Sequence, residues 1–295
     1  MITASGLTKT YGLYKALDHV SFGCGDGEIF GVIGHNGAGK TTMLKILSGL
    51  IDPTEGRLEI GGIDVLSDPD HLKRILGYLP EESRLYETMT VDEYLRFFGE
   101  IYALDRQTIE RRKRELLESL SLDPDGKKMG EFSKGMKRKV AIARSLIHNP
   151  SVLIYDEPTS GLDPMTSRYI IDYLKDLRNE GKTIVLSAHN LYQVEEICNK
   201  VMILRRGKVV AMGNMHELRE MFGSISYRIS FHMPDISHLE SCREYSFEGG
   251  LYHVSVPDIG EMNRCTEVIG RHGGRVERIE SHYPTLEEML IRIGK

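Results

Sequence analysis

Three glycines, a lysine and two threonines occupy the stretch GHNGAGKTT, residues 34–42. Glycine lets a backbone wrap a polyphosphate so closely that a side chain would clash, and successive N–H groups then point inward at the anion. Lys40 supplies a full positive charge to the β- and γ-phosphates, and the Thr41 hydroxyl is placed to coordinate Mg²⁺. The stretch therefore predicts a phosphate-binding loop made of Gly34, His35, Asn36, Gly37, Ala38, Gly39, Lys40, Thr41 and Thr42.

The residues on either side of this loop occur in the order that it requires. A β-prone apolar run, residues 29–33, precedes the loop. The residues after the loop have the apolar spacing of one helix face, at Met43, Leu44, Leu47 and Leu50. Because a helix N-terminus carries a partial positive charge, we expect a strand, a loop and a helix that together hold the phosphates.

Two acidic residues follow a second apolar run. Residues 152–155 read VLIY, which suits a buried parallel strand, and α/β sheets place ligands at the carboxyl ends of such strands. Asp156 can hold Mg²⁺ through water, and Glu157 can orient and polarise the water that attacks a γ-phosphate. The less favoured alternative is a strand that simply ends in two acids before a proline turn.

A serine precedes a periodic apolar segment between these two halves. Ser133 is a favoured N-cap, and the residues after it have one apolar helix face, at Val140, Ile142, Ala143, Leu146 and Ile147. Directly ahead of the acidic strand, EFSKGMKRKVAIARSL resembles the signature motif of ABC-type ATPases. Further motifs of that family then follow in the family order.

The chain resembles the ATP-binding subunits of ABC transporters over residues 1–222. The resemblance implies that Tyr11 in LTKTYG stacks on adenine and that Asp163 in SGLDP is the acid of the D-loop at a dimer interface. It implies that His189 in LSAHN is the switch histidine and acts with Glu157 in ATP hydrolysis. Two such domains would pack head to tail around two ATP molecules, each contacting the ATP of the other subunit through Ser133, Lys134, Gly135 and Met136.

The signature departs from the common family pattern. The usual sequence is LSGGQ, whereas FSKGM here carries Lys134 and Met136 in place of the second glycine and the glutamine. The phosphate-facing pair, Ser133 and Gly135, is retained. Lys134 could add charge near the phosphate bound by the other subunit or could point to solvent.

A carboxylate replaces another family residue in YLPEE, residues 78–82. In the family, this loop normally carries a glutamine that reaches Mg²⁺ and follows the transporter interface, and the resemblance puts Glu81 at that position. We predict that Thr41, Glu81 and Asp156 surround the metal and that Glu82 is a solvated neighbour. The alternative is that the two glutamates open a helix, because carboxylates are favoured near the positive end of a helix dipole.

Composition limits the classes of protein. The chain has 295 residues, 27% charged residues and a net charge of −5, which is typical of a globular protein and not of a nucleic-acid binder with a general positive field. No run approaches the roughly 18–20 apolar residues that a membrane span requires. The N-terminus lacks the charged-then-apolar order of a secretory signal, so we expect a cytoplasmic protein.

The expected fold is an α/β, P-loop nucleotide-binding domain of the ABC type over residues 1–222, followed by a small α+β domain over residues 223–295. The first domain would combine a mixed sheet, an antiparallel β part and a helical subdomain over about residues 84–148. We expect the run 111–114 in this subdomain to be a solvated basic face. The subdomain also carries candidate contacts for a membrane partner, with core packing as the alternative, at Tyr86, Phe97 and Phe98.

The second domain is expected to contain strands near residues 227–231, 244–247, 251–256 and 276–279, and helices over 259–271 and in PTLEEMLIRIG. One nucleotide-binding domain with such an extension resembles the ATPase subunits of exporters for drugs, antibiotics or ions. The resemblance implies ATP and Mg²⁺ as ligands, a separate integral membrane permease, and a homodimer or a pair with a related ATPase subunit on the inner face of the membrane.

A soluble ABC-type ATPase that acts on ribosomes or DNA is the alternative from another class. Such proteins usually join two nucleotide domains in one chain or carry long coiled-coil insertions. Because this chain has one phosphate loop and no sustained heptads, we expect no nucleic-acid partner. ATP binding without hydrolysis is less favoured, since Glu157 and His189 are both present.

Overall fold

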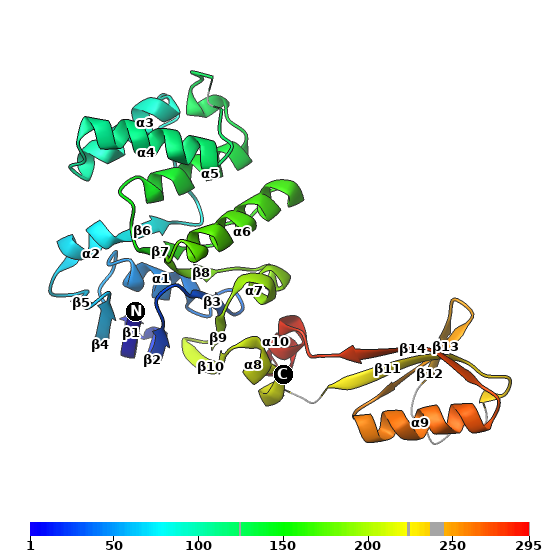
Figure 1. Cartoon of the computed structure of the whole chain (residues 1–295). Helices are drawn as coiled ribbons and strands as arrows, with labels where there is room; N and C mark the ends of the chain where they lie inside the picture. Colours follow the sequence, from blue (N-terminus) through cyan, green and yellow to red (C-terminus); the bar gives the residue numbers. More distant parts are fainter. Residues whose placement is uncertain (124, 223–224, 237–244, 295) are drawn as a thin grey trace. The chain divides into compact units, whose positions relative to one another are not determined.

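The structure is a computed structural model that describes residues 1–123, 125–222, 225–236 and 245–294. Two compact units divide the chain, Met1–Met215 and His216–Lys295 (Figure 1). Each unit has its own sheets and its own buried core.

A six-stranded sheet carries the phosphate-binding loop. Its strands are β3 (Ile29–Ile33), β6 (Leu76–Leu79), β7 (Val152–Tyr155), β8 (Thr183–Ser187), β9 (Lys200–Arg205) and β10 (Lys208–Gly213). The order is β10-β9-β3-β8-β7-β6, in which the β9–β10 pair is antiparallel and the other pairs are parallel. Every residue of β3, β7 and β8 is buried, as expected for parallel strands that are covered on both faces. The strands predicted on both sides of the site are therefore present, and β3 and β7 have the predicted bounds.

An antiparallel sheet packs against the helix that follows the loop. Its strands, in the order β2-β1-β4-β5, are β1 (Ile2–Tyr11), β2 (Tyr14–Cys24), β4 (Glu55–Ile60) and β5 (Ile63–Asp64). One hydrophobic cluster joins Phe22 of this sheet, Met43 of helix α1 (Lys40–Leu47) and Val32 of the six-stranded sheet. The apolar face of α1 therefore fixes the helix between two sheets, with its N-terminus at the loop.

Helix α1 ends earlier than the apolar spacing predicts. Gly49, at φ 64°, takes the left-handed conformation that commonly follows a helix end. Leu50 lies beyond it and is 56% exposed, so its predicted place on the buried face was wrong. The other predicted members of this face, Met43, Leu44 and Leu47, are buried.

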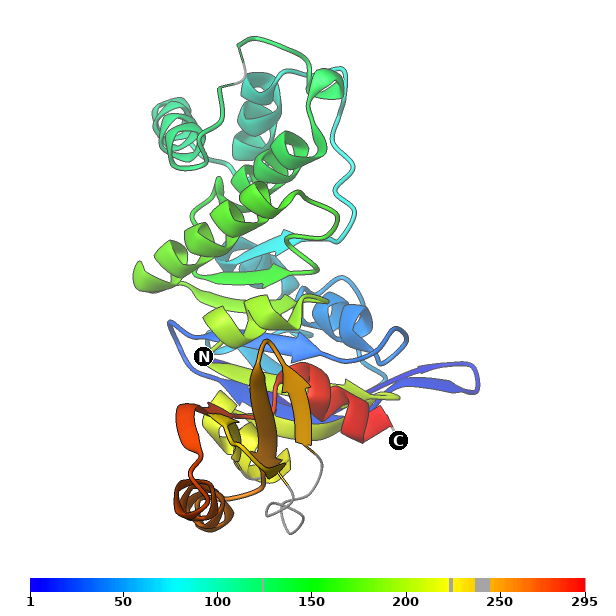
Figure 2. The same ribbon diagram turned by 90° about the vertical axis from the view of Figure 1, so that its right-hand side faces the viewer.

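Three helices gather at one end of the first unit, away from the antiparallel sheet (Figures 1 and 2). They are α3 (Val91–Ile101), α4 (Arg106–Ser119) and α5 (Lys134–Leu146), with a short 3-10 helix, η1 (Met129–Glu131), before α5. A capping box formed by Thr90 and Glu93 starts α3. The unit also contains α2 (Pro69–Ile75), α6 (Pro164–Asn179) and α7 (Leu191–Ile197).

The basic run at residues 111–114 is not uniformly solvated. Lys113 is 3% exposed, and its ammonium contacts the carboxylates of Glu110, at 3.0 Å, and Asp92. Arg112 donates a hydrogen bond to the Leu146 carbonyl at 2.9 Å. The predicted basic face was therefore wrong at these two residues, because α4 packs against both α3 and α5 and covers the long stems of these side chains.

The second unit is an α+β structure. Its elements are α8 (Met215–Phe222), β11 (Ser226–His232), β12 (Tyr245–Glu248), β13 (Leu251–Val256), α9 (Ile259–Arg271), β14 (Arg275–His282) and α10 (Leu286–Gly294). The antiparallel sheet has the order β12-β13-β11-β14, and α9 packs on one of its faces (Figure 1). Strand β13 and helix α9 have the predicted bounds, whereas residue 244 of the predicted second strand lies outside the described residues.

The division between the units falls near the start of α8, whereas the sequence interpretation kept all of α8 in the first domain. Within the second unit, the Arg219 guanidinium of α8 lies 5.1 Å from the centre of the Tyr283 ring. Arg292 of α10 donates a hydrogen bond to the Phe222 carbonyl. Over the described parts of both units, no helix is long and apolar enough to cross a membrane.

Candidate functional site

The loop between β3 and α1 has room for glycine alone at two positions. Gly34 and Gly39 have φ angles of 154° and 108°, within the range that disfavours other residues. A Cβ at Gly34 would lie 2.2 Å from the Leu204 carbonyl oxygen, and one at Gly39 would lie 2.5 Å from that of Ala16. The chain therefore passes close to its neighbours on one side and leaves the N-terminus of α1 open to an anion on the other.

Lys40, the first residue of α1, is 7% exposed. Its ammonium donates a hydrogen bond to the Gly34 carbonyl at 2.7 Å. Burial lowers the pKa of Lys40, while the negative charges of Glu157 and Asp156 act in the opposite direction. A polyphosphate in the loop would add further negative charge next to this buried ammonium.

The acidic pair at the end of β7 is held by a hydroxyl from the neighbouring strand. Ser187 donates a hydrogen bond to Asp156 Oδ1 at 2.5 Å and accepts one from the backbone N–H of Glu157 at 3.0 Å. Glu157 has a φ of 50°, a left-handed conformation that is uncommon for this residue type. Ser187 was not predicted from the sequence, although a polar residue at the end of the apolar run 183–186 was the available signal.

Glu157 is 5% exposed, and its carboxylate contacts His189, the predicted switch histidine. The backbone N–H of His189 donates to Glu157 Oε2 at 2.9 Å, and His189 Nε2 lies 3.3 Å from Oε1. In the described part of the chain, Oε1 has no hydrogen-bond partner. Burial raises the pKa of Glu157, against the opposing effects of His189 and Lys40. A buried carboxylate with a raised pKa and an oxygen that accepts no hydrogen bond from the described residues is suited to accept a proton from water.

Glu81 lines the same cavity as Glu157 and His189. It lies in a bend after β6, and the next helix, α3, begins at Val91, so the alternative that Glu81 and Glu82 open a helix was wrong. A cavity of about 390 Å³ brings together most of the predicted ATP and metal residues. Its lining is Tyr11, Tyr14, Ala16, Asn36, Gly37, Ala38, Gly39, Lys40, Thr41, Thr42, Glu81, Glu157 and His189.

The aromatic end of this cavity contains two tyrosines from the β1–β2 hairpin. Tyr11, the predicted adenine-stacking residue, is 50% exposed. The Tyr14 hydroxyl donates a hydrogen bond to the Gly37 carbonyl at 3.2 Å. Tyr14 was not predicted from the sequence, where its only signal was that a second aromatic residue follows Tyr11 by three positions.

Comparison with known proteins decides the family. A family model described as "ABC transporter" matches residues 17–160. The uncharacterized ABC transporter ATP-binding protein YhaQ of Bacillus subtilis is 35% identical over 300 residues, which cover 99% of this chain and 97% of that protein. The chain belongs to the ABC transporter ATP-binding proteins. The predicted family, fold class and ATPase activity of this ABC ATPase are thereby confirmed.

Two further similarities concern the nucleotide-binding part of the ABC ATPase. The linearmycin resistance ATP-binding protein LnrL of Bacillus subtilis is 35% identical over 224 residues, with 76% of this chain and 72% of that protein covered. A solved dimeric ATP-binding cassette in a post-hydrolysis state, with ADP and Pi bound, has a TM-score of 0.67 and 29% identity. That comparison covers 73% of this chain and 99% of the solved one.

The donor set of the ABC ATPase fits a metal that arrives with its nucleotide. In the described residues, no group of three or more His, Cys, Asp or Glu side chains is placed to hold a metal ion. Mg²⁺ in nucleotide sites is usually bound by one or two carboxylates together with phosphate oxygens. Thr41 and Glu81 line the cavity, whereas Asp156, at the end of β7 directly before Glu157, is not among its lining residues. The oxygen atoms of these three side chains are of the kind that Mg²⁺ binds together with phosphates.

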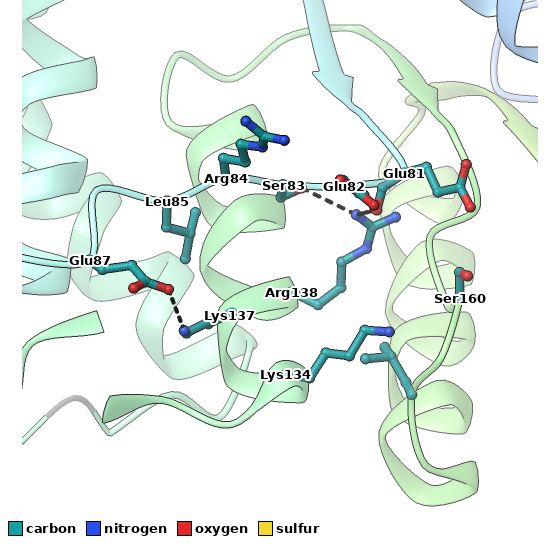
Figure 3. A pocket seen from close by; sticks show the side chains of 11 residues that line it. Glu81, Glu82, Ser83, Arg84, Leu85, Glu87, Lys134, Lys137, Arg138 and Ser160 are labelled. Atoms are coloured by element: carbon teal, nitrogen blue, oxygen red, sulfur yellow. Dashed lines mark hydrogen bonds and ion pairs between the residues drawn. The ribbon is translucent and has the colours of Figure 1, made fainter. Parts of the chain in front are cut away.

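The signature residues of the ABC ATPase lie outside the 390 Å³ cavity. Ser133 caps α5, and its hydroxyl accepts a hydrogen bond from the Met136 N–H at 3.2 Å. Lys134 lines a neighbouring cavity of about 700 Å³ (Figure 3). A Cβ on Gly161 would lie 2.1 Å from Lys134 Nζ, so this exposed side chain lies along the loop that leads to Asp163. In one chain, Lys134 thus contacts its own D-loop, an arrangement that neither sequence alternative included.

Asp163 starts α6. Its carboxylate accepts a hydrogen bond from the Thr166 N–H at 2.9 Å, and the Thr166 hydrogen bonds hold the pKa of Asp163 below its usual value.

A further residue of this region, Arg138, was not predicted from the sequence. Arg138 donates hydrogen bonds to the segment that carries Glu81 and to the turn that carries Glu157. The sequence signal for such a buried role was the position of this cation, four residues before Ile142 on the buried face of α5.

Proposed function

We propose that this ABC ATPase hydrolyses ATP with Mg²⁺ in the 390 Å³ cavity and thereby powers export through a separate integral membrane permease on the cytoplasmic face of the membrane. The observation that carries the hydrolytic part is the convergence of Lys40, Glu157 and His189 on one glycine-lined cavity. The transport part is supported by the family and by the resistance role in the name of the relative LnrL.

Catalysis in this site consists mainly of positioning and charge stabilisation, as in phosphoryl transfer generally. The loop N–H groups and Lys40 bind the phosphates, and His189 donates a hydrogen bond to the γ-phosphate. Glu157 orients the attacking water and accepts its proton. Mg²⁺, held by Thr41, Glu81 and Asp156, would neutralise charge that develops on the phosphate oxygens.

Hydrolysis is proposed to occur in a dimer with a second copy or a related ATPase subunit. Ser133, Lys134, Gly135 and Met136 lie outside the cavity of their own chain, which supports a role at the ATP bound by the other subunit. Asp163 belongs to the same interface in this proposal. ATP then acts as a ligand between the subunits, and its hydrolysis releases them.

Replacing Glu81 by Gln is expected to raise the Mg²⁺ concentration for half-maximal hydrolysis by about threefold or more, because a neutral amide attracts Mg²⁺ less than a carboxylate does. An Mg²⁺ titration of ATPase activity at fixed ATP measures the shift. Glu82→Gln removes the neighbouring carboxylate, which lines the larger cavity and not the 390 Å³ one, and serves as the control. Matching titrations for wild type and Glu81→Gln would remove Glu81 from the metal site.

An aromatic group at the helical end of the first unit is the proposed permease surface. Tyr86 is 51% exposed, Phe97 is 39% exposed, and their ring centres lie 6.0 Å apart. Phe98 is half-buried and stacks on Tyr86 at 6.5 Å. Exposed aromatic rings that already pack on a fixed core are typical anchors of protein interfaces.

Truncation of this surface is expected to weaken permease binding. Phe97→Ala removes an exposed ring and should lower the amount of permease that copurifies by about tenfold, the loss typical of an interface anchor. The matched control is Tyr192→Ala, which removes a ring that is 78% exposed on α7. Equal permease recovery with Phe97→Ala and wild type would exclude the surface.

The decisive test of the proposed function is affinity isolation of the tagged chain from detergent-solubilised native membranes, with mass identification of its partners. A polytopic membrane protein recovered in stoichiometric amount supports the transporter. Recovery in the soluble fraction with ribosomal or DNA-bound partners would instead support the alternative function, and the nucleotide chemistry would stand in either case.

A further inference from the structure

Arg138 is a buried arginine in the first turns of α5, the helix that Ser133 caps. Only 6% of the residue is exposed. On one side, its guanidinium binds the turn that carries the hydrolytic acids. Nε donates to the Pro158 carbonyl at 2.9 Å, and Nη2 donates to the carbonyls of Asp156 and Glu157 at 2.9 and 2.7 Å.

On the other side, the same guanidinium binds the segment that carries Glu81. Nη1 donates to the carbonyls of Pro80 and Glu81 at 2.6 and 3.0 Å and to the Ser83 hydroxyl at 3.2 Å. Figure 3 shows the Arg138 side chain reaching from α5 to this segment along the wall of the 700 Å³ cavity. One side chain of the signature helix therefore holds the backbone of both Glu81 and Glu157.

The contacts require an arginine. A guanidinium is a planar group with five N–H donors in fixed directions, whereas a lysine ammonium is a single point with three donors. All six acceptors here are carbonyl or hydroxyl oxygens. Burial lowers the pKa of Arg138 to about 10, so the group stays charged at neutral pH.

The Glu157 backbone shows what this contact controls. Its left-handed conformation, at φ 50°, is strained for a residue with a side chain. Three hydrogen bonds hold it there: the N–H donates to Ser187 Oγ, and the carbonyl accepts from Arg138 and from the Ser160 N–H. A shift of the guanidinium would therefore change the direction of the Glu157 carboxylate.

We propose that Arg138 is a positioning residue for ATP hydrolysis, which couples the signature helix to Glu81 and Glu157 of the same chain. The inference rests on the proposed dimer, in which Ser133 and Gly135 contact ATP held by the partner. That contact moves the start of α5, and Arg138 transmits the movement to the metal-facing and water-facing carboxylates of its own site. Each ATP thereby sets the hydrolytic geometry of the other site, and the two sites turn over cooperatively.

Arg138→Lys tests this coupling, because it keeps the charge and removes the planar set of donors. A displacement of about 1 Å in a catalytic group lowers rates by up to about 100-fold, so kcat is expected to fall by about tenfold or more. KM and the dissociation constant of a fluorescent ATP analogue should stay within about twofold, because Lys40 and the loop are untouched. The Hill coefficient for ATP should fall from above one to one.

Lys139→Gln is the matched control on the same helix. Lys139 lies next to Arg138, and its ammonium packs over the Tyr169 ring at 4.1 Å, away from both segments that Arg138 binds. Its kcat, KM and Hill coefficient should match those of the wild type. Thermal melting of every variant separates a loss of folded protein from a loss of turnover.

The outcomes separate this inference from the proposed function. An Arg138→Lys variant with wild-type kcat and Hill coefficient would overturn the inference and leave the ATPase assignment intact. A wild-type chain that fails to hydrolyse ATP with its permease would overturn both. If Arg138→Lys does not fold, Ser83→Ala, which removes a single acceptor, is expected to lower kcat by about threefold with unchanged melting. Unchanged kcat in Ser83→Ala would then overturn the inference.

Discussion

Replacing Glu157 by Gln is expected to stop ATP hydrolysis and to leave ATP binding intact. The amide retains an oxygen that can accept the His189 N–H hydrogen bond, but it cannot take a proton from the attacking water. A positioned general base contributes about 10²–10⁴-fold, so kcat should fall by at least about 100-fold. Because ATP then persists between the subunits, the variant should accumulate as an ATP-dependent dimer in size-exclusion chromatography.

The phosphate-release assay and the dimer assay check different parts of this result. Hydrolysis at the normal rate by Glu157→Gln would remove Glu157 from the catalytic assignment. Loss of hydrolysis without a dimer would leave the base assignment standing and contradict the head-to-tail dimer. Glu82→Gln, which removes a carboxylate outside the 390 Å³ cavity, should retain turnover and serves as the control.

Glu157→Gln is also expected to change the thermal stability of the folded chain in a pH-dependent way. Burial raises the pKa of Glu157 in the folded chain, which means that the folded state disfavours the ionised carboxylate. The wild type therefore loses stability as pH rises from the unfolded value of about 4.3 to the folded-state pKa, and the full loss is present above the folded-state pKa. Glu157→Gln should melt at a higher temperature than wild type at pH 8, and the difference should vanish near pH 4.

Replacing Lys40 by Met is expected to abolish detectable ATP binding while the nucleotide-free protein remains folded. Hydrogen bonds from charged groups contribute about 1.5–3 kcal/mol each, so loss of the ammonium should weaken ATP binding by at least about 10- to 100-fold. In the nucleotide-free chain, however, burial disfavours the charged form of Lys40, as its lowered pKa indicates. An apolar side chain of similar length should therefore leave the melting temperature unchanged or raise it.

Thermal melting with and without Mg²⁺ and ATP tests both the loss of ATP binding and the retained stability of Lys40→Met. Wild type should gain stability with ATP by mass action, and Lys40→Met should gain none. Lys45→Met removes an exposed lysine in the last turn of the same helix and should behave as wild type. An ATP-dependent rise in melting temperature for Lys40→Met equal to that of wild type would contradict the assignment of the loop.

Local sequence determined the phosphate loop and the strands beside it. Glycine and lysine at fixed spacing have few other uses, and the fully apolar runs 29–33 and 152–155 form strands with the predicted bounds. Ser133 was predictable as an N-cap because capping depends on residues within one helical turn. The sequence also determined the family, because its motifs keep the family order along the chain.

Tertiary structure alone decided which groups surround the hydrolytic carboxylates. Apolar periodicity indicates which face of a helix is buried but not which loops cover that face, so Arg138 was missed although it lies on the buried face of α5. Its acceptors come from two segments that are separated from it by roughly 20 and 60 positions along the chain. Glu81 was ambiguous for the same reason: a carboxylate next to a proline fits a helix start as well as a metal site. The path of the chain after β6, set by the pairing of β6 with β7, brings Glu81 to the cavity.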